Sequence, residues 1–281
     1  MRPPLRADDV AVDLDRLLSP ECTRCDLGAA SKKRALELAA EAIADRHAPL
    51  DARDVFDALL ARERLSSTAV GEGVTAVAPG DRVAWIQPGS CRSVRLVPAD
   101  RCVKLPEDVS TEIAGATLLR GLTAEYLLNR LLPVGPGRRV LIHAAAGGMG
   151  AILVPWAKAL GGVVFATAGG PEKCAMAKAA GADHVIDYKA EDWVAAVRDL
   201  TGGAGVHCVY DSVGRDTFMG ALEVLAPMGM AINYGAASGP VPPFPLQDLH
   251  PKSLIVTRPT LKTWIAKRED LDAASERLFS A

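Results

Sequence analysis

The residues best suited to chemistry form a run of small residues, His143–Gly150, between the apolar segment Val140–Ile142 and a helical pattern. Aligned to the pattern G-x-G-x-x-G, its three key positions are Ala145, Gly147 and Gly150. Small residues there leave main-chain N–H groups uncovered at the start of a helix, where a diphosphate can bind them. The run therefore predicts a dinucleotide-binding loop, and a purely structural turn is the alternative.

The end of the next apolar segment indicates which dinucleotide this loop would bind. A site for NAD usually carries Asp or Glu there, to bind the ribose hydroxyls. After Val163–Ala166 the sequence continues with Thr167–Gly170, which contains no carboxylate, and Lys173 follows, where it can pair with a 2′-phosphate. NADP(H) is therefore the predicted cofactor. The alternative is that Lys173, close to Glu172, is a solvated residue at a helix start.

Strands and helices must alternate around such a loop, and from about residue 107 onward the sequence has that alternation. The pattern predicts an α/β fold with a doubly wound parallel Rossmann sheet. Pro155 lies inside the first helical pattern, where it removes a hydrogen bond at a cost of about 3 kcal/mol. The predicted strands are Val140–His143, Val163–Ala166, His184–Ile186, Val206–Tyr210 and Met230–Tyr234, and the predicted helices lie at about 149–160, 171–180, 190–200 and 215–225.

The sequence before residue 107 has a different character. Residues 1–66 are rich in Ala, Leu, Asp and Arg and predict two amphipathic helices, neither of which carries a catalytic constellation. Residues 67–106 contain short β-like runs separated by turn signals. The two helices are predicted from Ser31 and near Asp51–Leu60, and the strands at Val83–Ile86, Ser93–Val97 and Cys102–Leu105.

Composition and charge argue against several classes of function. The chain is 49% hydrophobic and 23% charged, which is typical of soluble globular proteins, and its net charge of -2 favours neither nucleic acid nor an acidic membrane as partner. Aspartates near the start interrupt any apolar run that a secretory signal would need. Residues 144–170 are apolar apart from Lys158, but their glycines and Pro155 favour a buried α/β unit over a membrane span. A cytoplasmic location is therefore predicted.

The six cysteines lack the spacing of a disulfide framework and suit a reducing compartment. Cys22 and Cys25 form a C-x-x-C pair, but a zinc site would need a second pair of soft ligands, and the sequence has none at comparable spacing. No metal is therefore predicted. A redox dithiol and two buried cysteines beside a helix remain alternatives for this pair.

Several runs of this sequence match one known family. They are Pro79–Val83, Gly121–Ala124, Ala144–Gly150, Trp156–Gly161, Gly181–Ile186 and Tyr210–Gly214. Through them, residues from about 71 to 281 resemble the quinone-oxidoreductase branch of the medium-chain dehydrogenases, the zeta-crystallin-like group. The resemblance implies a zinc-free, two-domain reductase that binds NADPH and passes electrons to quinones, enones or related electrophilic carbonyl compounds. It also implies a homodimer formed through an edge of the nucleotide-binding sheet.

The resemblance further implies which residues bind the cofactor. Thr123 is implied near the nicotinamide, and Lys173 and Tyr188 beside the adenosine 2′-phosphate. Gly147, Gly148 and Gly150 are implied at the diphosphate, Asn233, Tyr234, Gly235 and Ser238 near the nicotinamide, and Ala146, Met149 and Ser212 complete the implied cofactor-binding set. For Tyr188 and Tyr234, plain packing is the alternative.

No catalytic side chain is assigned, because in such chemistry the cofactor supplies the hydride and the protein supplies orientation and water exclusion. His143, at the end of an apolar strand, is predicted to be structural. Asp211 is predicted to be a turn or supporting group rather than a general acid. Arg258–Thr260 also resembles a run of the family, with no assigned role.

The first part of the sequence resembles a different family. Leu18–Pro20, Ser31–Glu37 and Asp54–Thr68 are similar to the opening of a phosphotransferase-system enzyme IIA of the nitrogen-regulatory or fructose type. The Pro-His pair that carries the phosphorylated histidine in that family is absent here, so phosphate acceptance is not expected. The predicted domains are an enzyme-IIA-like α/β fragment (1–70), a partial GroES-like β-barrel segment (71–110), an NADP-binding Rossmann domain (111–260) and a truncated return to the substrate domain (261–281).

The sequence thus predicts an NADPH-dependent, zinc-independent oxidoreductase that reduces quinones or related electrophilic carbonyl compounds. Two alternatives of other classes stay open. One is a catalytically impaired nucleotide-binding or regulatory fusion protein, and the other is a phosphotransferase-system IIA-type regulator.

Overall fold

The computed structural model describes residues 40–41, 51–53, 74–87 and 96–281. The chain divides into two compact units, Met1–Pro79 and Gly80–Ala281, and every element named below lies in the second. The two predicted N-terminal helices, the Cys22–Cys25 pair and the predicted strand at 93–97 fall wholly or largely outside the described residues. The predicted domain boundaries stay predictions.

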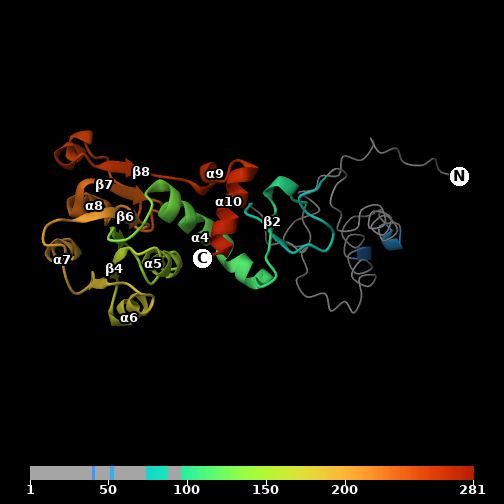
Figure 1. Cartoon of the computed structure of the whole chain (residues 1–281), viewed down its shortest axis with the longest axis horizontal. Helices are drawn as coiled ribbons and strands as arrows, with labels where there is room; N and C mark the ends of the chain where they lie inside the picture. Colours follow the sequence, from blue (N-terminus) through green and yellow to red (C-terminus); the bar gives the residue numbers. More distant parts are fainter. Residues whose placement is uncertain (1–39, 42–50, 54–73, 88–95) are drawn as a thin grey trace. The chain divides into compact units, whose positions relative to one another are not determined.

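A six-stranded parallel sheet forms the core of the second unit (Figure 1). Its strands lie in the order β5-β4-β3-β6-β7-β8, and each neighbouring pair is parallel. The strands are β3 (Arg139–Ile142), β4 (Val163–Ala168), β5 (His184–Asp187), β6 (Val206–Asp211), β7 (Leu225–Asn233) and β8 (Ile255–Thr257). All five predicted strands are present, and β8 is an unpredicted sixth at one edge.

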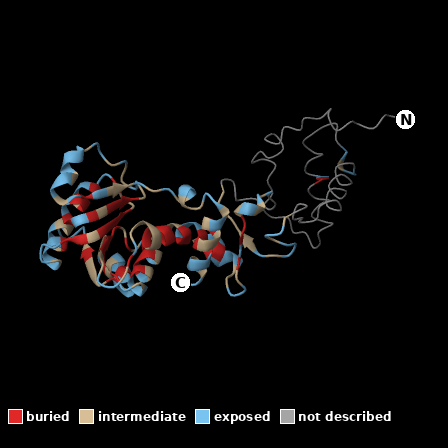
Figure 2. Ribbon diagram, turned by 45° about the horizontal axis from the view of Figure 1, so that its top comes forward, coloured by how far each residue is buried: buried red, intermediate tan, exposed pale blue. Residues whose placement is uncertain are grey.

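Helices cover both faces of this sheet, as the alternating pattern predicts. On one face pack α5 (Gly150–Ala159) and α6 (Pro171–Ala179), and on the other α7 (Trp193–Leu200) and α8 (Phe218–Val224). The strands between these layers are largely buried (Figure 2), which explains why they read as nearly continuous apolar runs. Helix α5 continues through Pro155. The prediction of a doubly wound parallel α/β fold is confirmed.

One element starts earlier than predicted. Strand β7 begins at Leu225, which pairs with Val206 of β6, and the pairing register then shifts before Met230. Pro227 and Gly229, which are typical of turns and bulges, concealed this start in the sequence. The predicted helix at 215–225 is correspondingly shortened to α8.

Two helices outside the sheet were not predicted. They are α4 (Thr111–Glu125), which continues into the π-helical turn η3 (Tyr126–Leu131), and α10 (Arg268–Phe279). The side chain of Leu278 in α10 packs directly on the backbone of α4, since a Cβ on Gly121 would lie 2.5 Å from the Cδ1 atom of Leu278. The buried carboxylate of Glu125 accepts a 2.7 Å hydrogen bond from Arg277. Tertiary contacts of this kind, rather than apolar periodicity, hold α4 and α10 together.

The remaining elements are short. They are β1 (Val83–Ala84), β2 (Val103–Lys104), the 3-10 turns η2 (Ala99–Arg101) and η4 (Leu246–Lys252), and α9 (Leu261–Trp264). Strands β1 and β2 pair antiparallel, so two of the strands predicted before residue 107 are present in shortened form. In the described part of the chain, no helix has both the length and the apolar character needed to cross a membrane.

Candidate functional site

The parallel arrangement gathers the carboxyl ends of all six strands along one edge of the sheet. Strand β3 lies between β4 and β6, and the sequence order of the strands reverses at this central position. Open α/β sheets bind ligands in the crevice beside such a reversal. The glycine loop, defined as residues 144–149, connects β3 to α5 at this point. The candidate site therefore lies where the sequence predicts it.

The glycine loop is fastened to the two neighbouring strands at its start. The N–H of His143 donates to the carbonyl of Tyr210 at 3.1 Å, and the N–H of Ala145 donates to the carbonyl of Thr167 at 3.0 Å. Between them Ala144 has a φ of 52°, in the left-handed region that non-glycine residues rarely adopt. The tight turn of the loop therefore falls on an alanine, held there by bonds to β4 and β6.

The rest of the loop leaves main-chain donors unbonded. The N–H groups of Ala146, Gly148, Met149 and Gly150 donate to no acceptor among the described residues. Gly148 is exposed, and Gly150 is the first residue of α5. Unbonded N–H groups at the positive end of a helix dipole attract and bind anions. This part of the site can therefore hold a diphosphate.

Small residues are required here by close contacts. A Cβ on Gly150 would lie 2.1 Å from the carbonyl oxygen of Ala145, so that no larger residue fits without opening the junction of strand and helix. A Cβ on Gly148 would instead meet the guanidinium of Arg120, at 2.9 Å from its Cζ atom. The loop at Gly148 thus faces solvent and one cationic side chain.

At the end of β4, Tyr188, one of the two residues predicted around the 2′-phosphate, contacts Gly169. A Cβ on this glycine would lie 2.5 Å from the hydroxyl of Tyr188, which follows β5, and 3.2 Å from the Cε atom of Lys189. Lys173 is exposed in the first turn of α6. Asp187 is also present, and its pKa is lowered because its carboxylate accepts hydrogen bonds from the N–H groups of Gly170 and Lys189.

At the ends of β6 and β7, the predicted nicotinamide-side residues form two tightly joined loops. A Cβ on Gly235 would lie 2.5 Å from the carbonyl oxygen of Ser212. The hydroxyl of Ser238 donates to the carbonyl of Val213 at 3.0 Å and accepts from the N–H of Asp216 at 3.1 Å. These side chains are engaged within the protein, so contacts to a ligand from this loop would come largely from its backbone.

Tyr234 follows β7 and packs against the buried cluster on the α5 face of the sheet. Its hydroxyl oxygen is buried without a hydrogen-bond partner among the described residues, and burial raises its pKa. The ring of Tyr234 is therefore packed against the core, which agrees with the alternative of plain packing for this residue.

A polar row runs across the strand ends on the α7 face of the sheet. It consists of Thr167, His143, Asp211, Asn233 and Arg258, of which all but Arg258 are buried. The Nδ1 atom of His143 lies 2.9 Å from the hydroxyl of Thr167. The amide of Asn233 donates to Asp211 at 3.4 Å and its oxygen accepts from Arg258. Hydrogen bonds within the row join the end of β4 to the residue after β3, and the ends of β6, β7 and β8 to one another.

His143 is enclosed within this row. Its ring stands edge-on to Trp193 at a centroid distance of 4.7 Å, and its Nε2 atom is buried without a partner among the described residues. Burial lowers the pKa of His143 to about 4, although the nearby charge of Asp211 opposes that shift. The histidine is therefore neutral near pH 7, in line with its predicted structural role.

Asp211 closes the turn after β6. Its Oδ1 atom accepts from the N–H of Val213 at 2.8 Å, from the N–H of Gly214 at 3.0 Å and from the hydroxyl of Thr217 at 2.9 Å. The prediction that Asp211 is a turn residue is confirmed. Arg258, which had no assigned role, donates to Asn233 and to the carbonyl of Gly235 at 3.0 Å, and so holds the loop after β7.

Thr123, predicted near the nicotinamide, lies on α4. It is half-buried, and its hydroxyl donates to the carbonyl of Leu119 at 2.7 Å within the same helix. Arg120 precedes it by one helical turn, so both residues lie on the same side of α4. Arg120 reaches the glycine loop at Gly148, whereas the place of Thr123 beside the nicotinamide stays a prediction.

The structure thus brings the predicted residues other than Thr123 to one edge of the sheet, and their roles in binding stay predictions. Sequence reasoning missed Arg120 and Lys189 at this edge. Lys189 adjoins Tyr188 in the sequence, which was a usable signal. Arg120 had none, because its position depends on how α4 packs against the loop.

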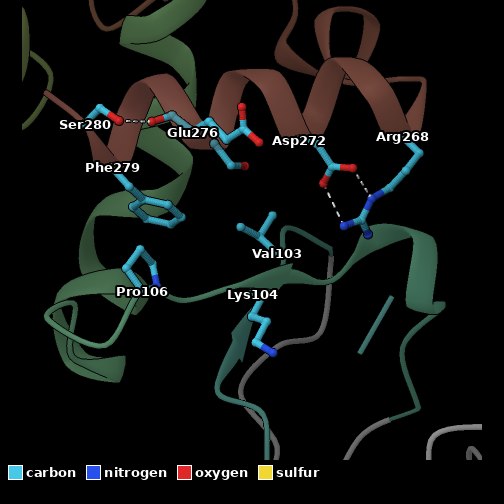
Figure 3. Close-up of a pocket in the computed structure, with 9 residues that line it drawn as sticks. Val103, Lys104, Pro106, Arg268, Asp272, Glu276, Phe279 and Ser280 are labelled. Atoms are coloured by element: carbon cyan, nitrogen blue, oxygen red, sulfur yellow. Dashed lines mark hydrogen bonds and ion pairs between the residues drawn. The ribbon is translucent and has the colours of Figure 1, made fainter. Parts of the chain in front are cut away.

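A separate groove of about 470 Å³ lies between β2 and α10 (Figure 3). The ion pair of Arg268 with Asp272 lies at one end, and Phe279 and Pro106 line the other. No residue of the glycine loop lines it. Its shape and lining do not indicate a ligand, so the candidate site stays at the strand ends.

Two family models match the chain in different parts. The model described as "Zinc-binding dehydrogenase" matches residues 148–280. The model described as "Phosphoenolpyruvate-dependent sugar phosphotransferase system, EIIA 2" matches residues 16–77. The second match coincides with the segment that resembles an enzyme IIA. Neither match decides whether the chain binds zinc.

Relatives of known name resemble the larger part of the chain. The 2-haloacrylate reductase of Burkholderia sp is 44% identical over 219 residues, which cover 75% of this chain and 66% of that protein. A crystal structure of 2-haloacrylate reductase has a TM-score of 0.72 at 43% identity and is covered to 68% by this chain. The Escherichia coli quinone oxidoreductase complexed with NADPH also has a TM-score of 0.72, at 44% identity, with 76% of this chain and 66% of that chain covered.

The sheet order and the strand-to-helix loop define a Rossmann-like α/β protein. With the similarity to these relatives, the chain belongs to the quinone-oxidoreductase-like family of medium-chain dehydrogenases and reductases. It spans less than two thirds of the length of the curated reductase, of which 66% is covered.

Proposed function

We propose that this chain is an NADPH-dependent, zinc-independent oxidoreductase that reduces quinones or related electrophilic enones. The observation that carries the proposal is the set of unbonded N–H groups at Ala146, Gly148, Met149 and Gly150, at the start of α5. An anionic diphosphate fits these donors, and family membership supports the same ligand class. Because Gly148 is exposed and Ala146 and Met149 are half-buried, a ligand can reach this part of the loop from solvent.

The preference for NADPH over NADH rests on the region around Gly169. Strand β4 ends without a carboxylate, Tyr188 and Lys189 supply a hydroxyl and a cation beside Gly169, and Lys173 adds a second cation in the first turn of α6. Asp187 lies at the same place, where its Oδ1 atom accepts from two main-chain N–H groups. A 2′-phosphate would therefore meet more positive than negative charge. The solved structure of a relative complexed with NADPH supports this choice.

Bound NADPH would supply the hydride. The chain would supply the diphosphate donors of the glycine loop, the rigid polar row beneath them, and Thr123 beside the reacting ring. No side chain of the described part is assigned as an acid or base, because His143 and Asp211 are committed to internal contacts. Orientation and exclusion of water are thus the protein's proposed contributions.

The N-terminal segment is proposed to be an enzyme-IIA-like fragment without phosphate acceptance. Its match to the EIIA 2 family supports the first part, and the absent Pro-His pair supports the second. The domain limits at about residues 70, 110 and 260, a cytoplasmic location and a homodimer are parts of the same proposal. They rest on family resemblance and composition.

The test is titration of the full chain with NADPH and NADH, followed by nicotinamide fluorescence, beside an assay of NADPH oxidation with 1,4-benzoquinone. We expect saturable binding of NADPH, weaker binding of NADH, quinone-dependent oxidation, and no loss of activity after treatment with a metal chelator. Binding without turnover would instead support a nucleotide-binding module, which the unrelated N-terminal segment makes the second candidate. Failure to bind either dinucleotide would overturn both.

A further inference from the structure

Arg120 places an unpaired positive charge on the glycine loop. A Cβ on Gly148 would lie 2.9 Å from its Cζ atom, 3.0 Å from Nη1 and 3.1 Å from Nε. Because these three distances are nearly equal, the guanidinium lies across Gly148 rather than pointing at it with one atom. Within the described part of the chain, the guanidinium forms no hydrogen bond and no ion pair.

This position is electrostatically unfavourable without an anion. The guanidinium lies at the start of α5, where the helix dipole is positive and four N–H groups point to no protein acceptor. A solvated arginine gains nothing from approaching such a site, since like charges repel. A bound diphosphate reverses the sign of the interaction, because a guanidinium can donate two parallel N–H groups to phosphate oxygens.

We propose that Arg120 is a diphosphate-binding residue of the nucleotide site, and that it donates from its guanidinium to the same diphosphate that the glycine loop holds. The inference rests on the proposed function, since it assumes that a dinucleotide binds there. The 2′-phosphate is the other anionic group of the cofactor, but its predicted partner Tyr188 lies at Gly169. Arg120 lies at Gly148 instead, so the diphosphate is its target.

The test uses the full chain and four probes: NADPH, NADH, ADP-ribose and adenosine 2′-monophosphate. The first three carry a diphosphate, whereas the last carries only the 2′-phosphate. For Arg120→Gln we expect affinity to fall about tenfold or more for the three diphosphate ligands, and by a similar factor for each. Binding of adenosine 2′-monophosphate should stay unchanged. Arg120→Lys should restore part of the affinity, because charge is kept and the paired geometry is lost.

The matched control is Arg198→Gln, which removes another exposed arginine, paired with Glu223 at the surface of α7. It should leave all four affinities unchanged. Thermal unfolding of Arg120→Gln should match that of the natural chain, since no described protein contact other than packing on Gly148 is lost. A fold defect therefore cannot imitate the expected result.

Three outcomes would overturn the inference. Equal affinities of Arg120→Gln and the natural chain would show that the guanidinium makes no contact with the ligand. Tighter binding by the variant would show that Arg120 obstructs the loop. A loss restricted to NADPH and adenosine 2′-monophosphate would move Arg120 to the 2′-phosphate. If the natural chain bound none of the four probes, the proposed function itself would fail, and that result is distinct from the other three.

Discussion

The glycine loop and the loops after β6 and β7 lie on the same edge of one sheet, yet they differ in how far their polar groups are hydrogen-bonded within the protein. In the glycine loop, four consecutive or nearly consecutive N–H groups have no protein acceptor. At β6 and β7, the Oδ1 atom of Asp211 and the hydroxyl of Ser238 are bonded within the protein, although the hydroxyl of Tyr234 is not. The first region is left open for a ligand, and the second is a scaffold that holds it in place.

Exposure explains how both arrangements are tolerated. A buried polar group without a partner costs about 1–3 kcal/mol, so the buried carboxylate of Asp211 must be saturated by its neighbours. Gly148 is exposed and Ala146 and Met149 are half-buried, so water can satisfy N–H groups there until an anion replaces it. We conclude from this difference that unbonded donors indicate a binding site only where solvent can reach them. Mutations in the two regions should accordingly affect different quantities.

The largest effect is expected from Asp211→Ala, which tests the scaffold. The N–H groups of Val213 and Gly214 and the hydroxyl of Thr217 would lose their acceptor in a buried turn. We expect the free energy of unfolding to fall by about 3–5 kcal/mol, measured by urea denaturation.

The control is Asp211→Asn, whose side-chain oxygen can still accept from all three donors. Its NH₂ group would face the amide of Asn233, which now donates to Oδ2. The Asn variant should therefore lose clearly less stability than the Ala variant. Equal stability of Asp211→Ala and the natural chain would contradict the description of this region as a scaffold.

Gly150→Ala tests the junction at which scaffold and binding loop meet. The new Cβ would overlap the carbonyl oxygen of Ala145 at 2.1 Å, and a backbone atom cannot swing away as a side chain can. We expect a loss of about 3 kcal/mol in unfolding free energy, the upper end for overpacking, together with loss of NADPH binding. Gly115→Ala in α4 is the matched control. No atom lies within 4 Å of its new Cβ, so it should be neutral or stabilise by about 0.5–1 kcal/mol.

The pH dependence of the unfolding free energy tests whether His143 is held neutral in the polar row. Its pKa is about 4 in the folded chain against an ordinary value of 6.5, so between these values the unfolded chain binds a proton that the folded chain does not. The histidine's contribution to stability is therefore complete above about pH 6.5 and is lost as the pH falls to 4, by about 3 kcal/mol.

His143→Asn removes this titration but leaves a polar group that can reach Thr167. The difference in unfolding free energy between natural chain and variant should therefore shrink or change sign from pH 7 to pH 4. Urea denaturation at several pH values measures it. Parallel pH profiles of the two proteins would show that His143 is not held neutral in the fold.

The sequence was sufficient to predict the parts of this edge that repeat a local pattern. The five strands, four of the helices and the glycine loop all follow from apolar runs, small residues and their spacing. Helices α4 and α10 escaped prediction because α4 contains two glycines and α10 is strongly charged, so that neither has a marked apolar stripe. Their stability comes from contacts such as Gly121 with Leu278, which no local pattern encodes.

Within the site the same distinction applies. His143, Asp211 and Asn233 were each recognisable as residues at strand ends, but their alignment in one row depends on the register of parallel strands. Arg258 joins the row from β8, whose short strand gave no signal. Arg120 reaches Gly148 only through the packing of α4. Residues that contact the loop from distant segments are therefore the ones that sequence reasoning misses.

The smallest effect is expected from Lys173→Gln, which tests the open region alone. Lys173 is exposed at the start of α6, so its removal should not change stability measurably, and a pair with the 2′-phosphate would be weakened by solvent. We expect NADPH to bind about tenfold less tightly and NADH to bind unchanged, because NADH lacks the 2′-phosphate. Lys178→Gln, which removes a cation later on the same helix, is the control and should leave both affinities unaltered.

A similar loss for both dinucleotides would place Lys173 at the diphosphate or in a general electrostatic role. An unchanged preference for NADPH would transfer the recognition of its 2′-phosphate to Tyr188 and Lys189, which already meet at Gly169.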